Sequence, residues 1–207
     1  MCPEQLGAFA QFIQALCALA MVAIAWAGLS TWKRSLAGTA EQRASEKVLR
    51  PVFRLRNRIN TGRDPAKHSW ESTGRPISPE ESSAERALLD ERYGNRRRLE
   101  PVYEALVQLQ SAKEIGTAYW GAECEKLLGA LEKLGNRFMN AHLHYFASAL
   151  QDVHSGGNPK EKFAAMYDVL YSEKTPDNFG NELEAAVQSI VKFLREKLYA
   201  RTSKKKS

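Results

Sequence analysis

The side chains most able to do chemistry are three histidines in the second half of the chain, His142, His144 and His154. Two histidines bind one metal ion from a helix when they lie one turn apart, as in a His-x-x-x-His pattern. Here the first two are separated by a single residue, which directs them to nearly opposite sides of a helix, and the third lies almost three turns further on. The spacing predicts surface or boundary histidines, and we expect no metal site and no cofactor.

The three cysteines, Cys2, Cys17 and Cys124, show neither a metal-knuckle spacing nor a redox Cys-x-x-Cys pair. Cys124 is flanked by Glu123 and Glu125, whereas a nucleophilic thiol needs a neighbouring base or cation. This cysteine falls on the apolar face of a predicted helix, so packing explains it. We therefore predict reduced thiols and no catalytic residue.

The elements around these residues begin with an apolar segment, Leu6 to Leu29, whose only ionisable side chain is Cys17. About 20 apolar residues cross the hydrocarbon core of a bilayer, so the segment predicts a transmembrane anchor over residues 1–29. A cleaved signal peptide is the alternative, because Ala25-Trp26-Ala27 resembles a cleavage site. Against it, no Lys or Arg precedes the segment, which is also longer than the apolar core of a signal peptide.

Basic residues resume directly after the apolar segment, at Lys33 and Arg34. The positive-inside rule then places the N-terminus outside and the rest of the chain in the cytoplasm. Indole rings prefer the boundary between lipid and water, so Trp26, Trp32, Lys33 and Arg34 are predicted to lie at the membrane interface. The lipid bilayer is thus the first expected partner.

The formal net charge of +6 is unevenly distributed. Basic residues outnumber acidic ones by seven between Ser30 and Arg63 and by five from Arg195 onward, whereas acidic residues are in excess by five from Asp64 to Lys192. The inner leaflet of a membrane carries anionic lipid and attracts such basic segments. The candidate contacts to anionic lipid are Arg50, Arg54, Arg58, Lys204, Lys205 and Lys206. Nucleic acid would be attracted by the same charge, but no zinc-finger, RRM or KH signature accompanies it, so we favour lipid.

A basic juxtamembrane helix is predicted over residues 30–63, since its apolar side chains recur at helical spacing. These side chains are Val48, Val52, Leu55 and Ile59. Pro51 should kink or restart this helix. An irregular loop is predicted over residues 64–79, within the Gly- and Pro-rich stretch from Asn60 to Pro79, and Trp70 in it is a candidate contact to a protein partner.

Residues 80–200 read as a helical bundle, followed by a basic tail over residues 201–207. Ser78-Pro79-Glu80-Glu81 predicts a helix start, while Gly94-Asn95 and Pro101 could interrupt that helix. In the next helix the apolar side chains alternate spacings of four and three residues: Trp120, Cys124, Leu127, Leu131, Leu134, Phe138, Ala141 and Tyr145. Such a seam is typical of closely packed helices. A shorter helix opens at Pro159, and a last one carries Leu183, Val187, Ile190, Leu194 and Leu198 on one face.

The predicted fold is therefore all-α, with one N-terminal transmembrane helix followed by a cytoplasmic bundle of four to six helices. Three stretches, Thr31–Glu41, Val48–Arg56 and Glu114–Gly121, resemble a group of uncharacterised bacterial membrane-anchored helical proteins. The resemblance implies this architecture and a bacterial inner membrane, and it implies no activity or site.

The preferred functional hypothesis is a membrane-tethered interaction or scaffold protein that binds an unknown protein partner or itself. One alternative is a membrane-linked sensory or regulatory protein, in stress response or phage defence, with a relay at Pro51. The other is an enzyme whose site in the helical bundle has no recognisable motif.

Overall fold

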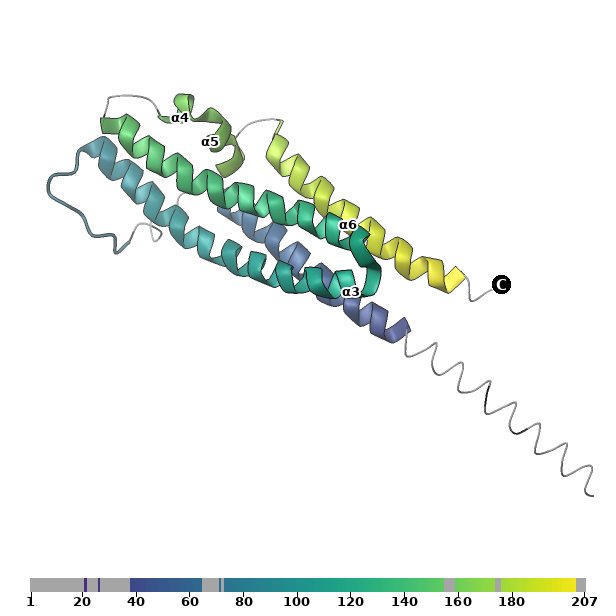
Figure 1. The fold of residues 1–207 in the computed structure, drawn as a ribbon. Coiled ribbons are helices and arrows are strands. Elements are labelled where there is room, and N and C mark those ends of the chain that lie inside the picture. Colours follow the sequence, from purple (N-terminus) through teal and green to yellow (C-terminus); the bar gives the residue numbers. More distant parts are fainter. Residues whose placement is uncertain are drawn as a thin grey trace, which may run out of the picture. The chain divides into compact units, whose positions relative to one another are not determined.

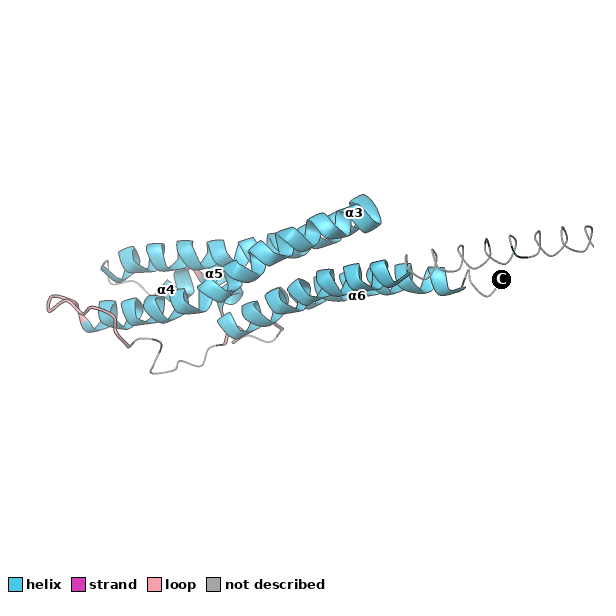
Figure 2. Cartoon of the chain, turned by 90° about the horizontal axis from the view of Figure 1, so that it is seen from below, coloured by secondary structure: helices cyan, strands magenta, loops and turns pink. Residues whose placement is uncertain are grey.

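The computed structural model describes residues 21, 26, 38–64, 71, 73–154, 159–173 and 176–203. The chain divides into two compact units, Met1–Arg43 and Ala44–Ser207, of which the second is described almost completely. Every regular element within the described residues is a helix, as Figure 2 shows. The all-α class predicted from the sequence is therefore confirmed for this part of the chain.

The predicted transmembrane segment, Leu6–Leu29, lies outside the described residues except for Met21 and Trp26, which are helical and exposed. Among the helices that are described, none is both long and apolar enough to cross a bilayer. The anchor and its orientation therefore stay predictions.

Three long helical segments build the second unit. The first helix covers residues 38–62, of which residues 44–62 belong to this unit. The second, α3, covers Ser83–His154 and doubles back at Gly121, whose φ of 72° lies in the left-handed region that glycine adopts most readily. α3 thus forms two arms, residues 83–120 (the first arm) and 122–154 (the second arm), which lie side by side in Figure 1. The third, α6, covers Asn178–Ser203.

The four rods, helix 38–62, the two arms of α3 and α6, form a ring in chain order. Each neighbouring pair is joined by a contact between polar side chains: Arg54 with Gln108, Lys113 with Glu132, Arg137 with Glu182, and Glu184 with Arg56. A second contact in each pair shows that neighbouring rods are antiparallel: Asp64 with Arg98, Gly116 with Cys124, Glu123 with Lys197, and Asp177 with Arg63. The second unit is therefore an up-and-down four-helix bundle, in which helix 38–62 lies diagonally across from the second arm.

The apolar stripes predicted from the sequence form the core of this bundle. Val48, Val52, Leu55 and Ile59 of helix 38–62 have no exposed surface, and Val187 and Ile190 of α6 are equally buried. Burial of one such side chain contributes about 1.5–3 kcal/mol. In the predicted seam, Cys124, Leu131, Phe138, Ala141 and Tyr145 of the second arm are buried, while Leu127 and Leu134 are half-buried, as is Trp120 at the end of the first arm.

Two glycines let the arms of α3 approach closely. A Cβ atom on Gly135 would lie 2.6 Å from Leu106 Cδ2, and one on Gly116 would lie 2.7 Å from Cys124 Sγ. Both distances are too short for real carbon contacts, so any larger residue would push the arms apart. The close packing of the hairpin therefore depends on these two positions.

Several predicted helix boundaries are wrong. The helix predicted to start at Ser78 begins at Ser83, where the Ser82 hydroxyl accepts a hydrogen bond from the Glu85 N–H. Gly94-Asn95 and Pro101 do not interrupt α3, because a long packed face outweighs their local preferences. Helix 38–62 likewise does not restart at Pro51, and it continues through Gly62 into the stretch predicted to be irregular.

Two short helices, α4 (Pro159–Lys162) and α5 (Ala164–Leu170), replace the single helix predicted after Pro159. The break falls at Phe163, whose φ of −113° and ψ of 33° are not helical. α5 buries Tyr167, Val169 and Leu170 against α3, near the end of the bundle where α6 begins (Figure 1).

Substitution of the two interior glycines of the second arm should have opposite effects. Gly135→Ala should lower the free energy of unfolding by about 1 kcal/mol or more, because its methyl group overlaps Leu106 in a filled core. Gly129→Ala is the control: its nearest neighbour would be Lys113 Nζ at 4.0 Å, so the higher helix propensity of alanine should stabilise the protein by about 0.5–1 kcal/mol. Chemical denaturation measures the free energy of unfolding of both variants. Equal changes in that free energy would contradict the close packing of Gly135 against Leu106.

Candidate anion-binding surface

Within the second unit, the outward face of helix 38–62 carries four exposed basic side chains, Lys47, Arg50, Arg54 and Arg58. We call these four residues the basic ridge. Their spacing of three or four residues places them on one side of the helix, opposite the apolar stripe that enters the core. Three of the predicted lipid contacts, Arg50, Arg54 and Arg58, thus lie together on one exposed surface.

A shallow, open hollow of about 500 Å³ lies along this ridge. Its lining comes entirely from helix 38–62: Arg50, Phe53, Arg54, Asn57, Arg58 and Thr61. Guanidinium groups donate paired hydrogen bonds to oxyanions, while the Asn57 amide and the Thr61 hydroxyl are uncharged donors. The arrangement can therefore bind a carboxylate, sulfate or phosphate group.

The arginines of the ridge keep their charge uncompensated. Arg54 Nη1 donates to a neutral acceptor, Gln108 Oε1, at 2.6 Å. Within the described residues, Arg50 and Arg58 make no ion pair. By contrast, the arginines that connect elements of the bundle each meet a carboxylate: Arg56, Arg63, Arg75, Arg98 and Arg137. The ridge is thus available to an anion from outside the chain.

Arg63, directly after helix 38–62, fixes the position of that helix in the bundle. Its guanidinium is 2% exposed and donates from Nη1 and Nη2 to the two oxygens of Asp177, each at 2.7 Å. Nε donates to the Val169 carbonyl at 2.8 Å, and Nη2 also to the Asp168 carbonyl at 3.0 Å. The group lies 4.9 Å from the ring centroid of Phe179. One side chain therefore joins helix 38–62, α5 and the start of α6.

Asp177 has a second role, because its Oδ1 accepts the Gly180 N–H at 2.9 Å and so caps α6. The hydrogen bonds from Arg63 hold the pKa of this carboxyl below its usual range. In the sequence, Arg63 stands out only as part of the basic segment between Ser30 and Arg63. An acidic residue just before a helix does signal a cap, but its pairing with an arginine more than a hundred residues earlier has no local signature.

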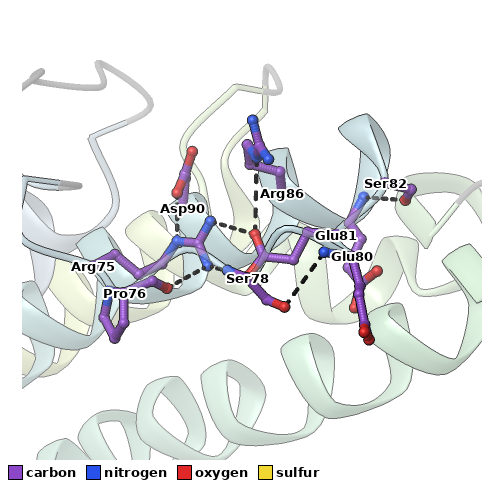
Figure 3. Close-up of polar contacts among 9 residues, drawn as sticks. Arg75, Pro76, Ser78, Glu80, Glu81, Ser82, Arg86 and Asp90 are labelled. Carbon is purple, nitrogen blue, oxygen red and sulfur yellow. Dashed lines mark hydrogen bonds and ion pairs between the residues drawn. The ribbon is translucent and has the colours of Figure 1, made fainter.

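The chain between helix 38–62 and α3 is held to the first arm by two ion pairs. Figure 3 shows Arg75 between Glu81 and Asp90, with Nη2 at 2.8 Å from Glu81 Oε2 and Nε at 2.6 Å from Asp90 Oδ1. The bond from Arg75 lowers the pKa of Glu81 to about 2. Nearer helix 38–62, Arg98 donates to both oxygens of Glu71, at 2.8 and 2.7 Å. The loop predicted as irregular is thus anchored at residues 71 and 75.

A cluster of buried tyrosines lies between α5 and the arms of α3. The Tyr171 hydroxyl donates to Glu91 Oε1 at 2.6 Å and accepts from Asn95 Nδ2 at 2.8 Å, and the rings of Tyr167 and Tyr171 are 4.5 Å apart. Burial is the main cause that raises the pKa of Tyr145, Tyr167 and Tyr171 well above its usual range. These phenols therefore stay protonated at neutral pH, and their contacts pack α5 against α3.

His142 is buried at 5% exposure, so its predicted place at the surface or boundary is wrong. The ring lies 4.8 Å from the Phe146 ring, and neither ring nitrogen has a hydrogen-bond partner among the described residues. Burial, with a smaller effect from the positive charge of Arg92, lowers the pKa of His142 to about 4. His144 is exposed as predicted, and the side chain of His154 lies outside the described part.

Cys124 is fully buried on the seam, and burial raises the pKa of its thiol to about 11, so it stays a thiol at neutral pH. Within the described residues, no three His, Cys, Asp or Glu side chains gather where they could hold a metal ion. Among the other predicted contacts, Trp32, Lys33, Arg34, Trp70, Lys204, Lys205 and Lys206 lie outside the described residues.

Comparison with known proteins gives no further assignment: the chain matches no protein-family model, no curated protein and no solved structure.

Replacement of His142 should remove part of the acid sensitivity of the fold. Its pKa in the folded state, about 4, lies below the ordinary value of 6.5, so the unfolded chain takes up a proton that the folded chain excludes. Stability should therefore fall as the pH drops from about 6.5 towards 4, by up to about 3 kcal/mol.

The His142→Leu variant should lose this pH-dependent part of the stability, whereas the variant His144→Leu, a control at an exposed position, should keep it. Chemical denaturation at a series of pH values measures both variants against the wild type. Identical pH profiles for His142→Leu and the wild type would show that His142 is not buried in its neutral form.

Proposed function

We propose that this chain is a membrane-tethered interaction or scaffold protein of the bacterial inner membrane. In this proposal the segment Leu6–Leu29 crosses the bilayer and the helical bundle lies on the cytoplasmic side. The observation that carries the proposal is the basic ridge. Helix 38–62 follows the apolar segment closely in the chain, and the arginines of the ridge face outward and meet no carboxylate within the described residues.

The membrane-spanning segment would bring the basic ridge close enough to anionic lipid to bind it. Attraction between exposed charges is screened over about 8 Å at physiological salt, so a basic surface acts on anionic lipid only when something holds it close. A bilayer-spanning segment does this for the helix that follows it. The basic ridge would then hold one side of the bundle at the inner leaflet.

The remaining faces of the bundle are available for a protein partner or a second copy of the chain. α3 exposes four large apolar side chains, Tyr103 at 60%, Val107 at 46%, Tyr119 at 47% and Leu143 at 61%. The alternative hypotheses gain no comparable support from the described residues. For the sensory hypothesis, helix 38–62 is uninterrupted at Pro51, the position of the expected relay. For the enzyme hypothesis, the buried tyrosines and the Cys124 thiol are protonated at neutral pH.

Cell fractionation tests the proposal. The full-length chain with a C-terminal tag should stay with bacterial membranes after alkaline carbonate extraction, because a spanning helix resists extraction and a peripheral protein does not. Protease added to spheroplasts should leave the tag intact. A chain that begins at Trp32 is the control and should be released by carbonate. Release of the full-length chain, or loss of the tag to external protease, would refute the proposal.

A further inference from the structure

The hollow on the basic ridge has features that a diffuse attraction to anionic lipid does not require. Arg50, Arg54 and Arg58 line one depression, whereas a merely basic surface would spread its charges. The same depression contains two uncharged donors, Asn57 and Thr61. A phosphate group has several acceptor oxygens, and this mixture of charged and neutral donors suits it.

One hydrogen bond orients Arg54 in the absence of a ligand. Gln108, on the first arm, accepts from Nη1 at 2.6 Å, which leaves the Nε and Nη2 donors of the guanidinium for an anion. Because the amide is neutral, it orients the arginine without cancelling its charge. Preorganised donors lose less conformational entropy on binding and so bind a ligand more tightly.

We propose that this hollow binds the phosphate of one anionic phospholipid headgroup. The inference rests on the proposed membrane tether and adds a discrete binding site to it. Phe53 also lines the hollow, and its ring adds apolar surface beside the arginines. The hollow is open to solvent, and its volume of about 500 Å³ is large enough for a headgroup.

The charge of the rest of the bundle favours a lipid over nucleic acid. Acidic residues outnumber basic ones by five between Asp64 and Lys192. An extended polyanion binds by contacts with many phosphates in succession, and beyond the ridge it would meet this acidic surface. A single headgroup needs only the hollow itself.

Native mass spectrometry of the full-length chain in detergent tests the site. The chain is incubated with equal amounts of phosphatidylglycerol and phosphatidylcholine, and the retained lipid is counted. The triple variant R50Q/R54Q/R58Q removes the guanidinium groups of the hollow. The matched control, R96Q/K126Q/K133Q, removes the same charge from exposed positions on α3.

The wild type and the α3 control should both retain one phosphatidylglycerol in preference to phosphatidylcholine. The hollow variant should lose that preference, with affinity lower by roughly a hundredfold, since each of the three basic residues near an anionic surface contributes about a factor of five. The charge-preserving variant R50K/R54K/R58K should bind roughly tenfold more weakly than the wild type, because an ammonium group cannot form the paired bonds of a guanidinium.

Four results would overturn the inference. These are equal retention of phosphatidylglycerol by the hollow variant and the wild type, equal loss of it in both Gln variants, wild-type affinity in the Lys variant, and displacement of the lipid by inorganic phosphate or a short RNA at similar concentration.

Circular dichroism checks that the variants fold. If the triple Gln variant loses helix, R50Q/R58Q replaces it, because this double variant keeps the bond between Arg54 and Gln108.

Carbonate extraction separates this inference from the proposed function. A hollow variant that stays in the membrane but loses its phosphatidylglycerol preference supports the site. Membrane retention without any preference in the wild type refutes the site and leaves the tether intact. Release of the wild-type chain from membranes refutes the tether itself.

Discussion

The arrangement of the bundle depends on one buried cation, the guanidinium of Arg63. A charge at 2% exposure is tolerable only when it is paired, and here it meets both oxygens of Asp177 and three backbone carbonyls. Loss of one partner from such a pair costs about 3–5 kcal/mol. Because this contact fixes the end of helix 38–62 against α5 and α6, it also sets the rotation of that helix. The apolar stripe then faces inward and the basic ridge faces outward.

The same rule, that a buried charge needs a partner and an exposed one does not, divides the arginines into two groups. Arg63 and Arg98 are largely buried, pair with carboxylates and hold segments of the chain together. Arg50 and Arg58 lie on the surface and have no such role in the described residues. Arginines that do not stabilise the bundle are free to bind an external anion, which is why the proposed site lies on this face.

The sequence predicted what depends on local pattern. The stripe Val48, Val52, Leu55 and Ile59 and the exposure of the arginines between them both follow from a period of 3.6 residues. Features that depend on distant partners were missed. The pairing of Arg63 with Asp177 joins residues that only the folded chain brings together. His142 was predicted at the surface because histidine is usually exposed, but its position lies on a buried face of the helix. Gly121 was overlooked as the turn of the hairpin, since only its backbone angle distinguishes it from the glycines inside the arms.

The central claim is that helix 38–62 turns its basic face to the inner leaflet. Glu46, one turn before Arg50 and outside the hollow, and Asn140, on the diagonally opposite second arm, are both exposed, so a spin label at either position, introduced through cysteine in a chain without its native cysteines, should be tolerated. In vesicles that contain phosphatidylglycerol and a nickel-chelating lipid, paramagnetic relaxation should be strong at position 46 and weak at position 140. Equal relaxation at the two positions, or stronger relaxation at position 140, would contradict this account.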